Sequence, residues 1–223
     1  MEINLKNTTE KIVIIGGSGN GTVIASTIED CKDDGQNIEC IGFLNDIEKE
    51  INGYPVLGGI RNMDWKKLPK EYKFIYAMSS VKKSADRYQL LLDLNIPIER
   101  FATVIHPSSI VSKKSKIGTG VALMPLTLVS PNAIIGNHSH MLAQSFIGHH
   151  AEIGEMVFVA NNASIGGFIK IKNGAHIGSN STTIEHISIG EYSIIGLGSV
   201  VLKDIKDYET VVGNPARVIG SLK

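Results

Sequence analysis

Apolar residues recur at every sixth position along the second half of this chain. Counting in steps of six from Ile105, seventeen positions reach Val201 without an insertion, and Thr183 alone among them is not apolar. A glycine directly follows eight of these positions. An α-helix repeats every 3.6 residues or so and a strand every two, so neither explains this spacing. A fixed six-residue period is typical of a hexapeptide β-helix.

Three steps of six make one triangular coil of eighteen residues, so the repeat predicts between five and six coils. Neighbouring coils stack like the strands of a sheet, roughly 4.8 Å apart. Residues eighteen positions apart should therefore lie one above the other. A prism of this kind leaves flat side walls uncovered, and we expect it to form an oligomer.

The first hundred or so residues carry the pattern of an α/β domain. Residues 11–15 form an apolar run typical of a buried parallel strand, a glycine-rich turn follows at 16–21, and a helix is predicted over 22–32. This order begins a βαβ unit. The pattern continues with strands at 38–43 and 73–78, a loop at 54–59, a short helix at 62–68 and a long helix at 82–94. We predict a small Rossmann-like βαβαβ domain over 1–102 and a β-helix domain with a C-terminal tail over 103–223.

The glycine-rich turn is a candidate ligand site. Glycines let a ligand approach the backbone, and the helix N-terminus offers unpaired N–H groups to a phosphate. Its spacing, G-G-x-G-x-G, is not the dinucleotide fingerprint G-x-G-x-x-G, so it favours a nucleotide diphosphate over NAD. The alternative is a tight joint between strand and helix that binds nothing. The candidate residues are Gly17, Ser18, Gly19, Asn20 and Gly21.

Polar residues also follow the next two predicted strands. Asn45 and Asp46 lie just past the second strand, and Ser79 follows the third. In open parallel sheets, ligands lie beyond the carboxyl ends of the strands, so Asp46 could hold a base or a ribose. The alternative for 44–46 is a solvated turn.

Composition narrows the class of protein. Lys plus Arg and Asp plus Glu both total 22, so no net charge recruits nucleic acid or a membrane surface. The two cysteines, Cys31 and Cys40, lack a metal-ligand spacing and fit a reducing compartment. The polar leader 1–11 resembles no signal peptide, and no apolar run is long enough to span a membrane. We expect a soluble, cytoplasmic protein.

The repeat, the ending GLGSVVLKDI…VVGNPARVIG and the opening IVIIGGSGNG…IGFLND resemble the bacterial sugar acetyltransferases of hexapeptide type. More narrowly, they resemble the nucleotide-aminosugar N-acetyltransferases of the bacillosamine pathway and the related sialic-acid O-acetyltransferases. The resemblance covers about residues 10 to 220. It implies a left-handed parallel β-helix, acetyl-CoA bound along the prism, a nucleotide-linked sugar on the N-terminal domain, and a homotrimer with active sites at subunit interfaces.

The resemblance also implies a catalytic base. The chemistry needs a group that accepts a proton from the attacking amine, and histidine suits this near neutral pH. All seven histidines fall in the repeat, and the family's base segment matches residues 146–150, which makes His149 the base. Eighteen residues further, Gly167 matches the position that contacts the acetyl group, and we expect its N–H to bind the thioester oxyanion.

Two positions depart from the family pattern. The family usually follows its base with an acidic residue, but this chain has His150, which we place in the substrate site. Either another carboxylate, such as Glu152, assists His149, or His149 acts without one. Many relatives carry histidine in the glycine turn, where this chain has Asn20.

Other residues are candidates for binding acetyl-CoA. Glycines allow close approach and cations pair with phosphates, and the candidates are Gly196, Gly198, Lys203 and Arg217. For Lys203, simple surface solvation is the alternative. His140, Phe158 and His176 stack at eighteen-residue spacing. We predict a subunit-interface column there, and no metal.

The sequence is compatible with three functions. The leading hypothesis is transfer of acetyl from acetyl-CoA to the amino group of a nucleotide-linked amino-dideoxy sugar, as in surface-glycan biosynthesis, by direct attack. The alternatives are O-acetylation of sialic acid or another sugar hydroxyl, and a non-catalytic β-helix protein that binds sugar nucleotides. The same prism supports all three, so the repeat alone does not decide among them.

Overall fold

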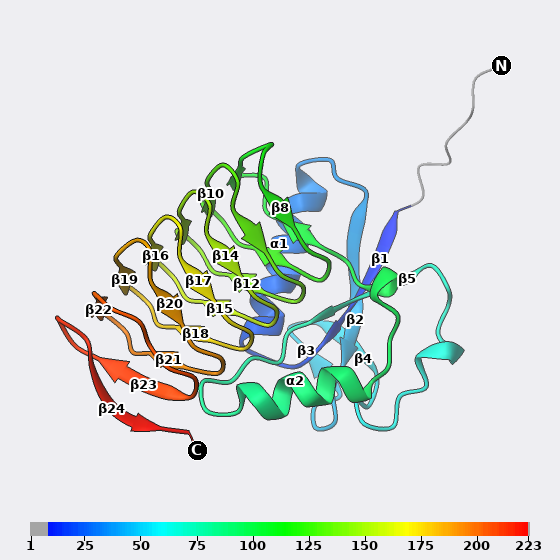
Figure 1. Ribbon diagram of the computed structural model, residues 1–223. Helices are drawn as coiled ribbons and strands as arrows, with labels where there is room; N and C mark the ends of the chain where they lie inside the picture. Colours follow the sequence, from blue (N-terminus) through cyan, green and yellow to red (C-terminus); the bar gives the residue numbers. More distant parts are fainter. Residues whose placement is uncertain (1–8, 223) are drawn as a thin grey trace.

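An α/β domain lies against one side of a parallel β-helix in the computed structural model, which describes residues 9–222 (Figure 1). Most of the predicted polar leader, residues 1–8, lies outside the described residues. No helix among residues 9–222 has the length and apolar character to cross a bilayer.

The N-terminal domain is built on a five-stranded sheet of order β3-β4-β2-β1-β5. Its strands are β1 (Glu10–Ile15), β2 (Ile38–Leu44), β3 (Glu50–Ile51), β4 (Tyr54–Gly58) and β5 (Tyr72–Tyr76). Its helices are α1 (Asn20–Asp33), α2 (Ser84–Asp93) and the 3₁₀ turns η1 (Trp65–Lys67) and η2 (Ile98–Arg100). β1 pairs in parallel with both β2 and β5, so the predicted βαβ start is confirmed.

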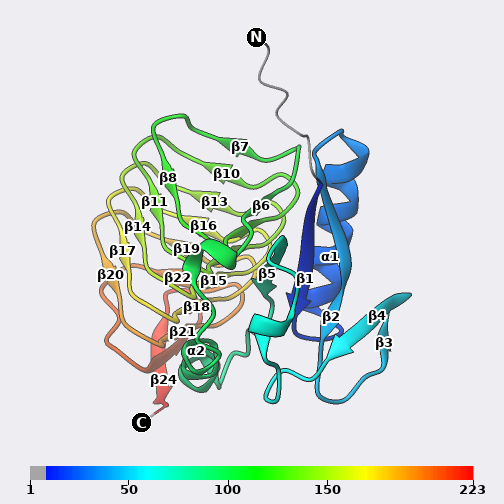
Figure 2. The same cartoon turned by 90° about the vertical axis from the view of Figure 1, so that its right-hand side faces the viewer.

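Two predicted elements of this domain were wrong. The segment predicted as a loop at 54–59 forms β4, which pairs with β2 on one side and with β3 on the other. The signal was Asn52-Gly53, whose φ angles of 51° and 81° make the two-residue turn typical of a hairpin. The helix predicted over 62–68 is only η1, three residues long. Figure 2 shows β3 and β4 at the edge of the sheet away from the prism.

The repeat region forms seventeen two-residue strands, as the step of six predicts. They are β6 (Val104–Ile105), β7 (Ile110–Val111), β8 (Lys116–Ile117), β9 (Ala122–Leu123), β10 (Leu128–Val129), β11 (Ile134–Ile135), β12 (His140–Met141), β13 (Phe146–Ile147), β14 (Glu152–Ile153), β15 (Phe158–Val159), β16 (Ser164–Ile165), β17 (Lys170–Ile171), β18 (His176–Ile177), β19 (Thr182–Thr183), β20 (Ser188–Ile189), β21 (Ile194–Ile195) and β22 (Val200–Val201). Each pairs in parallel with the strand eighteen residues away, and the parallel β-helix is confirmed.

Three sheets make the walls of the prism. The domain-facing sheet has the order β24-β23-β21-β18-β15-β12-β9-β6 and includes the C-terminal strands β23 (Glu209–Val212) and β24 (Arg217–Ser221). The apolar sheet runs β22-β19-β16-β13-β10-β7, and the charged sheet runs β20-β17-β14-β11-β8. The two are named for their outward residues near the first coils: Ile110, Leu128 and Phe146 on one, Lys116, Glu152 and Lys170 on the other. The inward residues form one continuous buried core.

Thr183, the one polar residue in the inward column, has a structural reason. Elsewhere the glycine N–H after the inward residue bonds to a carbonyl on the next coil, as from Gly148 to Ile165 at 2.9 Å. Gly166 N–H instead donates to the Thr183 Oγ1, also at 2.9 Å. The hydroxyl therefore replaces a ladder carbonyl at this coil, and its burial is compensated by the bond it makes.

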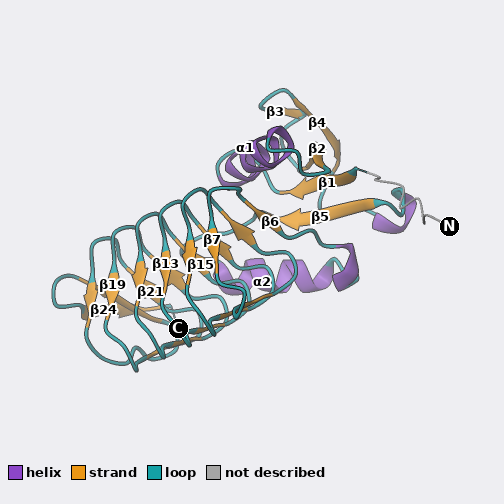
Figure 3. Cartoon of the chain, turned by 90° about the horizontal axis from the view of Figure 1, so that it is seen from above, coloured by secondary structure: helices purple, strands orange, loops and turns teal. Residues whose placement is uncertain are grey.

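The domain-facing sheet shares a core with the α/β domain. Ile24 and Ile28 of α1 belong to the same buried cluster as Ala122 and Met124 of the coils. In Figure 3, α2 also lies alongside the prism, at a place separate from α1. The boundary between 102 and 103 therefore separates two patterns of sequence, but the two parts pack together in space.

The interface-column prediction was wrong for His140, which is covered by its own chain. Its side chain is only 4% exposed and lines a small cavity with Tyr76 and Ser79 of the α/β domain. Burial, and to a lesser degree the neighbouring His138, lower the pKa of His140 to about 4, although a backbone hydrogen bond with Tyr76 opposes the shift. The repeat marks His140 as outward-facing but carries no information on what covers that face.

The Thr183 bond predicts a measurable cost. Thr183→Val keeps the shape but leaves the part-buried Gly166 N–H without its hydroxyl partner, so it should lower the free energy of unfolding by about 1–3 kcal/mol. Urea unfolding would measure this, with Thr183→Ser as the variant that keeps the hydroxyl. A Thr183→Val protein as stable as wild type would mean that the ladder closes on the Thr183 carbonyl instead.

The buried histidines predict that stability falls with acid. Burial lowers the pKa of His138, His140 and His176 to about 4, against about 6.5 in an unfolded chain. Between these values the unfolded state binds more protons, so the free energy of unfolding should drop as pH falls from about 6.5 towards 4. His140→Asn should reduce that slope by up to about 1.4 kcal/mol per pH unit, as measured by urea unfolding across this range. An unchanged slope would contradict the buried neutral state of His140.

Candidate active site

His149 and His150 lie in the turn between β13 and β14, where the apolar sheet meets the charged sheet. We call this edge of the prism the His149 vertex. At the same turn of other coils stand Asn132, Phe168 and His186. These three residues and His150 have φ between 55° and 63°, the left-handed conformation that turns each coil. The repeat therefore stacks their side chains at eighteen-residue spacing.

Aromatic rings form a stack along the His149 vertex. The rings of His150 and Phe168 lie 4.7 Å apart at 11°, and those of Phe168 and His186 lie 4.7 Å apart at 7°. His149 meets Phe168 edge-on, with ring centroids 5.0 Å apart. The stack holds the plane of His150, and the edge contact limits where His149 can lie.

The two histidines are joined by a hydrogen bond. His149 Nδ1 lies 3.2 Å from His150 Nδ1, and His150 Nε2 lies 3.0 Å from Asn132 Nδ2. His149 is exposed, and within residues 9–222 nothing hydrogen-bonds to its Nε2. That nitrogen is therefore available to a ligand, as a general base requires.

Gly167 leaves the space that the His149 ring occupies. A Cβ at Gly167 would lie 2.8 Å from His149 Cε1, so any side chain would displace the ring. The Gly167 N–H makes no hydrogen bond within the described chain, whereas the Gly166 N–H is taken by Thr183. Of the two glycines, only Gly167 has a free donor beside His149, and its role as oxyanion donor stays a prediction.

The glycine turn connects β1 to α1 and brings two predicted substrate residues together. Gly19 has a φ of 95°, which only glycine adopts readily, and no side chain caps α1. Asn20 donates its side-chain amide to the Ser79 hydroxyl. Gly21 is buried, and a Cβ there would lie only 3.0 Å from the Phe43 ring.

Glu48 lies beside this turn, although the sequence pattern did not single it out. Its Oε1 accepts a hydrogen bond from the Ser18 hydroxyl at 3.2 Å, and the same oxygen lies 3.2 Å from where a Gly17 side chain would begin. It stands in the loop after β2, four residues past Leu44. Sequence spacing does not predict that Glu48 lies beside the glycine turn, because the contact forms only when the loop after β2 folds back towards that turn.

Asn45 and Asp46 hydrogen-bond within their own loop and to two neighbouring segments. Asn45 Oδ1 accepts from the N–H groups of Ile47 and Glu48 at 2.8 and 2.7 Å, and its Nδ2 donates to Gly16 O at 3.1 Å. Asp46 Oδ1 accepts from the Ile60 N–H at 2.7 Å. These bonds support the turn interpretation, and a role in ligand binding stays a prediction.

The two predicted halves of the site do not meet within one chain. The α/β domain packs on the domain-facing sheet, whereas the His149 vertex joins the other two sheets. The acetyl-CoA candidates are divided in the same way. Gly196 follows β21 and Gly198 lies in the next turn, Arg217 begins β24, and Lys203 stands three coils from His149 in the His149 column.

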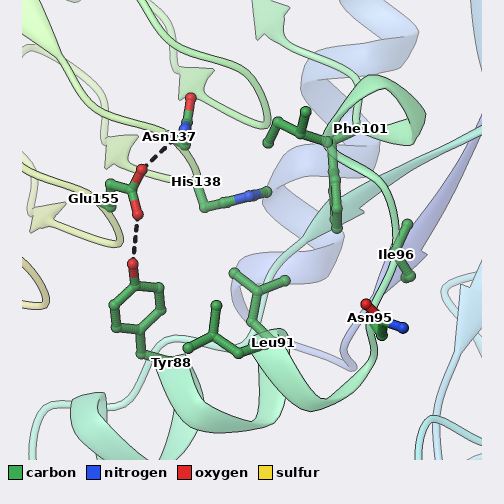
Figure 4. A pocket seen from close by; sticks show the side chains of 10 residues that line it. Tyr88, Leu91, Asn95, Ile96, Phe101, Asn137, His138 and Glu155 are labelled. Carbon is green, nitrogen blue, oxygen red and sulfur yellow. Dashed lines mark hydrogen bonds between the residues drawn. The ribbon is translucent and has the colours of Figure 1, made fainter.

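A pocket of about 440 Å³ lies elsewhere, between α2 and the coils (Figure 4). Glu155 accepts hydrogen bonds there from the Tyr88 hydroxyl and from Asn137 Nδ2, the latter at 2.9 Å. Its floor includes buried His138, whose ring meets Phe101 edge-on at 4.5 Å. None of the predicted site residues lines it. Across residues 9–222, no cluster of three His, Cys, Asp or Glu side chains is placed to hold a metal.

Comparison with known proteins identifies the N-terminal domain. The model of the PglD N-terminal domain matches residues 11–89. A dTDP-3-amino-3,6-dideoxy-alpha-D-galactopyranose 3-N-acetyltransferase from Aneurinibacillus thermoaerophilus is 50% identical over 42 residues, 19% of this chain and 22% of that protein. Mitochondrial serine acetyltransferase 3 from Arabidopsis thaliana is 36% identical over 132 residues, 58% of this chain and 30% of that protein. The matches therefore span less than a third of these curated relatives.

Solved structures match nearly the whole chain. The acetyltransferase domain of PglB from Neisseria gonorrhoeae FA1090, in complex with acetyl coenzyme A, has a TM-score of 0.81 at 24% identity and covers 95% of this chain and 100% of that one. PerB from Caulobacter crescentus, in complex with CoA and GDP-perosamine, has a TM-score of 0.78 at 24% identity, with coverage of 94% and 97%. This chain therefore joins a PglD-type N-terminal domain to a hexapeptide β-helix, the architecture that it shares with PglB and PerB.

Proposed function

We propose that this protein transfers acetyl from acetyl-CoA to the amino group of a nucleotide-linked amino sugar. The observation that carries the proposal is the pairing at the His149 vertex: a histidine with a free Nε2 beside a glycine with a free N–H. PerB was solved with CoA and GDP-perosamine, PglB with acetyl coenzyme A, and a curated relative is named for N-acetylation of a dTDP-amino sugar. These names supply the substrate class that the geometry alone would leave open.

The reaction proceeds by direct attack. The amine nitrogen bonds to the acetyl carbon, its proton passes to His149 Nε2, and the oxyanion that forms is held by the Gly167 N–H. The intermediate then collapses, the CoA sulfur leaves, and it takes a proton back from His149. Burial raises the pKa of the Cys31 and Cys40 thiols to about 11, and both lie outside the β-helix, which supports a route without an acyl-cysteine.

The nucleotide binds the α/β domain at the glycine turn. Gly17, Gly19 and the start of α1 offer backbone N–H groups to the diphosphate. The Asn20–Ser79 pair supplies an amide and a hydroxyl on the same side of the sheet. Glu48, held by Ser18, accepts hydrogen bonds, so it suits a ribose or base N–H better than a phosphate.

A complete site needs a second copy of the chain. The glycine turn and the His149 vertex belong to different sides of one protomer, so the sugar of one copy reaches the base of another. The apolar sheet beside His149 exposes Ile110 and Phe146, and burying such a stripe favours association. We propose a homotrimer, with acetyl-CoA lying between prisms near Gly196, Gly198, Lys203 and Arg217.

The acceptor class is tested by measuring release of the CoA thiol. Purified protein is mixed with acetyl-CoA and UDP-, dTDP- or GDP-linked 4-amino-4,6-dideoxy sugars, and separately with sialic acid. We expect thiol release with an amino-sugar nucleotide and none with sialic acid. Release with sialic acid alone would support O-acetylation instead. The Arabidopsis protein, which is named a serine acetyltransferase, also matches this chain. Absence of CoA binding would support the non-catalytic alternative.

Loss of the base should be severe. His149→Ala should lower kcat by about two to four orders of magnitude, because it removes the proposed proton acceptor beside Gly167. Steady-state kinetics on the best amino-sugar nucleotide would measure it. A variant that retains more than about a tenth of wild-type kcat would remove His149 from this role.

Gly167 should tolerate no side chain. Gly167→Ala would place a methyl 2.8 Å from His149 Cε1 and push the ring aside, so kcat should fall at least about tenfold while the fold persists. Gly220→Ala is the matched control, since a Cβ there meets nothing within 4 Å. Equal kcat for the two variants would contradict the proposed geometry.

A further inference from the structure

A chain of hydrogen bonds extends behind the proposed base. His149 Nδ1 contacts His150 Nδ1 at 3.2 Å, and His150 Nε2 contacts the Asn132 side-chain amide at 3.0 Å. No acidic side chain hydrogen-bonds to either histidine within residues 9–222. The group that normally charges and orients a catalytic imidazole is thus replaced here by a second imidazole and an amide.

The direction in which these hydrogen bonds are donated decides whether His149 Nε2 can accept a proton. If the amide oxygen of Asn132 faces His150, then His150 Nε2 carries a proton and its Nδ1 is an acceptor. His149 Nδ1 must then donate, which leaves His149 Nε2 unprotonated and able to act as a base. If the amide nitrogen faces His150, every proton shifts by one place and His149 Nε2 carries a proton.

The amide is free to take the productive orientation. A half-turn of the Asn132 side chain exchanges its oxygen and nitrogen at the same position. The structure gives this side chain no other hydrogen bond among the described residues, so nothing opposes the turn. The Phe168 ring, stacked on His150 at 4.7 Å and backed by His186, holds His150 in line with both partners.

We propose that Asn132 and His150 are positioning residues that fix the His149 tautomer, with Asn132 Oδ1 facing His150, so that Nε2 is left free. The effect of this relay on catalysis rests on the proposed function, whereas the tautomer of His149 does not depend on that function. When His149 becomes imidazolium, its Nδ1–H remains donated to the lone pair on His150 Nδ1. The relay therefore serves in both protonation states without a buried carboxylate.

The tautomer can be observed without any activity. In protein labelled with ¹⁵N-histidine at a pH where imidazoles are neutral, His149 is assigned by the signal lost in His149→Gln. We expect wild-type His149 to carry its proton on Nδ1. Asn132→Leu removes the amide that ends the hydrogen-bond relay. His149 should then return to the Nε2–H form that neutral imidazole prefers in water. A wild-type Nε2–H tautomer, or the same tautomer in both proteins, would overturn the relay.

Kinetics separate positioning from folding. Asn132→Leu should lower kcat by about 10- to 100-fold, the usual effect of removing an orienting partner, with KM changed less than about twofold. Asn132→Asp, which can only accept, should keep kcat near wild type. Asn162→Leu is the matched control, because Asn162 has the same turn conformation at another vertex and Leu126 already occupies that column.

Each kinetic outcome bears on the relay. Wild-type kcat in Asn132→Leu, or equal losses in Asn132→Asp and Asn132→Leu, would overturn it, as would a loss in Asn162→Leu as large as that in Asn132→Leu. If wild-type protein released no CoA thiol with any acceptor, the proposed function would fail. The ¹⁵N spectra would still decide the relay in that case.

Discussion

Parallel pairing between residues eighteen positions apart is the constraint on which the rest of this structure depends. It brings inward residues into one buried core and outward residues into columns along the three walls, so every coil inherits the neighbours of the coil before it. The same pairing aligns the turns between the sheets, where residues in the left-handed backbone conformation stack on one another. A side chain at a corner therefore has two fixed neighbours, one coil to each side. The proposed base His149, the proposed oxyanion donor Gly167 and the proposed positioning residues His150 and Asn132 all derive their geometry from this stacking.

The inward half of the sequence pattern was sufficient to predict the β-helix. Each coil buries its own residues against the next, so the six-residue period determines both burial and register. Thr183 is polar but keeps the register of the repeat, because its hydroxyl accepts the hydrogen bond that a backbone carbonyl accepts at the other coils. The step of eighteen likewise placed Gly167 beside His149 correctly. Local periodicity succeeds where the contacts it implies are made within the repeat.

The outward half could not be predicted in the same way. His140 was expected at a subunit interface, but the α/β domain of its own chain covers it. Glu48 reaches the glycine turn only because the loop after β2 folds back, and Glu155 meets Tyr88 across the junction with α2. The contacts of His140 and Glu155 depend on how one domain packs on the other, and that of Glu48 depends on the path of a loop. Period and spacing describe a column but not its partner, so such contacts need the three-dimensional structure.

The proposed base, His149, lacks an acidic hydrogen-bond partner among the described residues, and neutral side chains lie beside it instead. A carboxylate beside an imidazole supplies charge and orientation together, but only orientation is indispensable, since a misplaced base cannot reach its proton. Stacking on Phe168 and bonding to Asn132 supply orientation through neutral groups. Neutral partners stabilise imidazolium less than a carboxylate would. An amine acceptor tolerates this better than a hydroxyl does, because the amine nitrogen is the stronger nucleophile and needs less help from the base. The composition of the His149 vertex therefore supports the proposal that the acceptor is an amino sugar rather than a sugar hydroxyl.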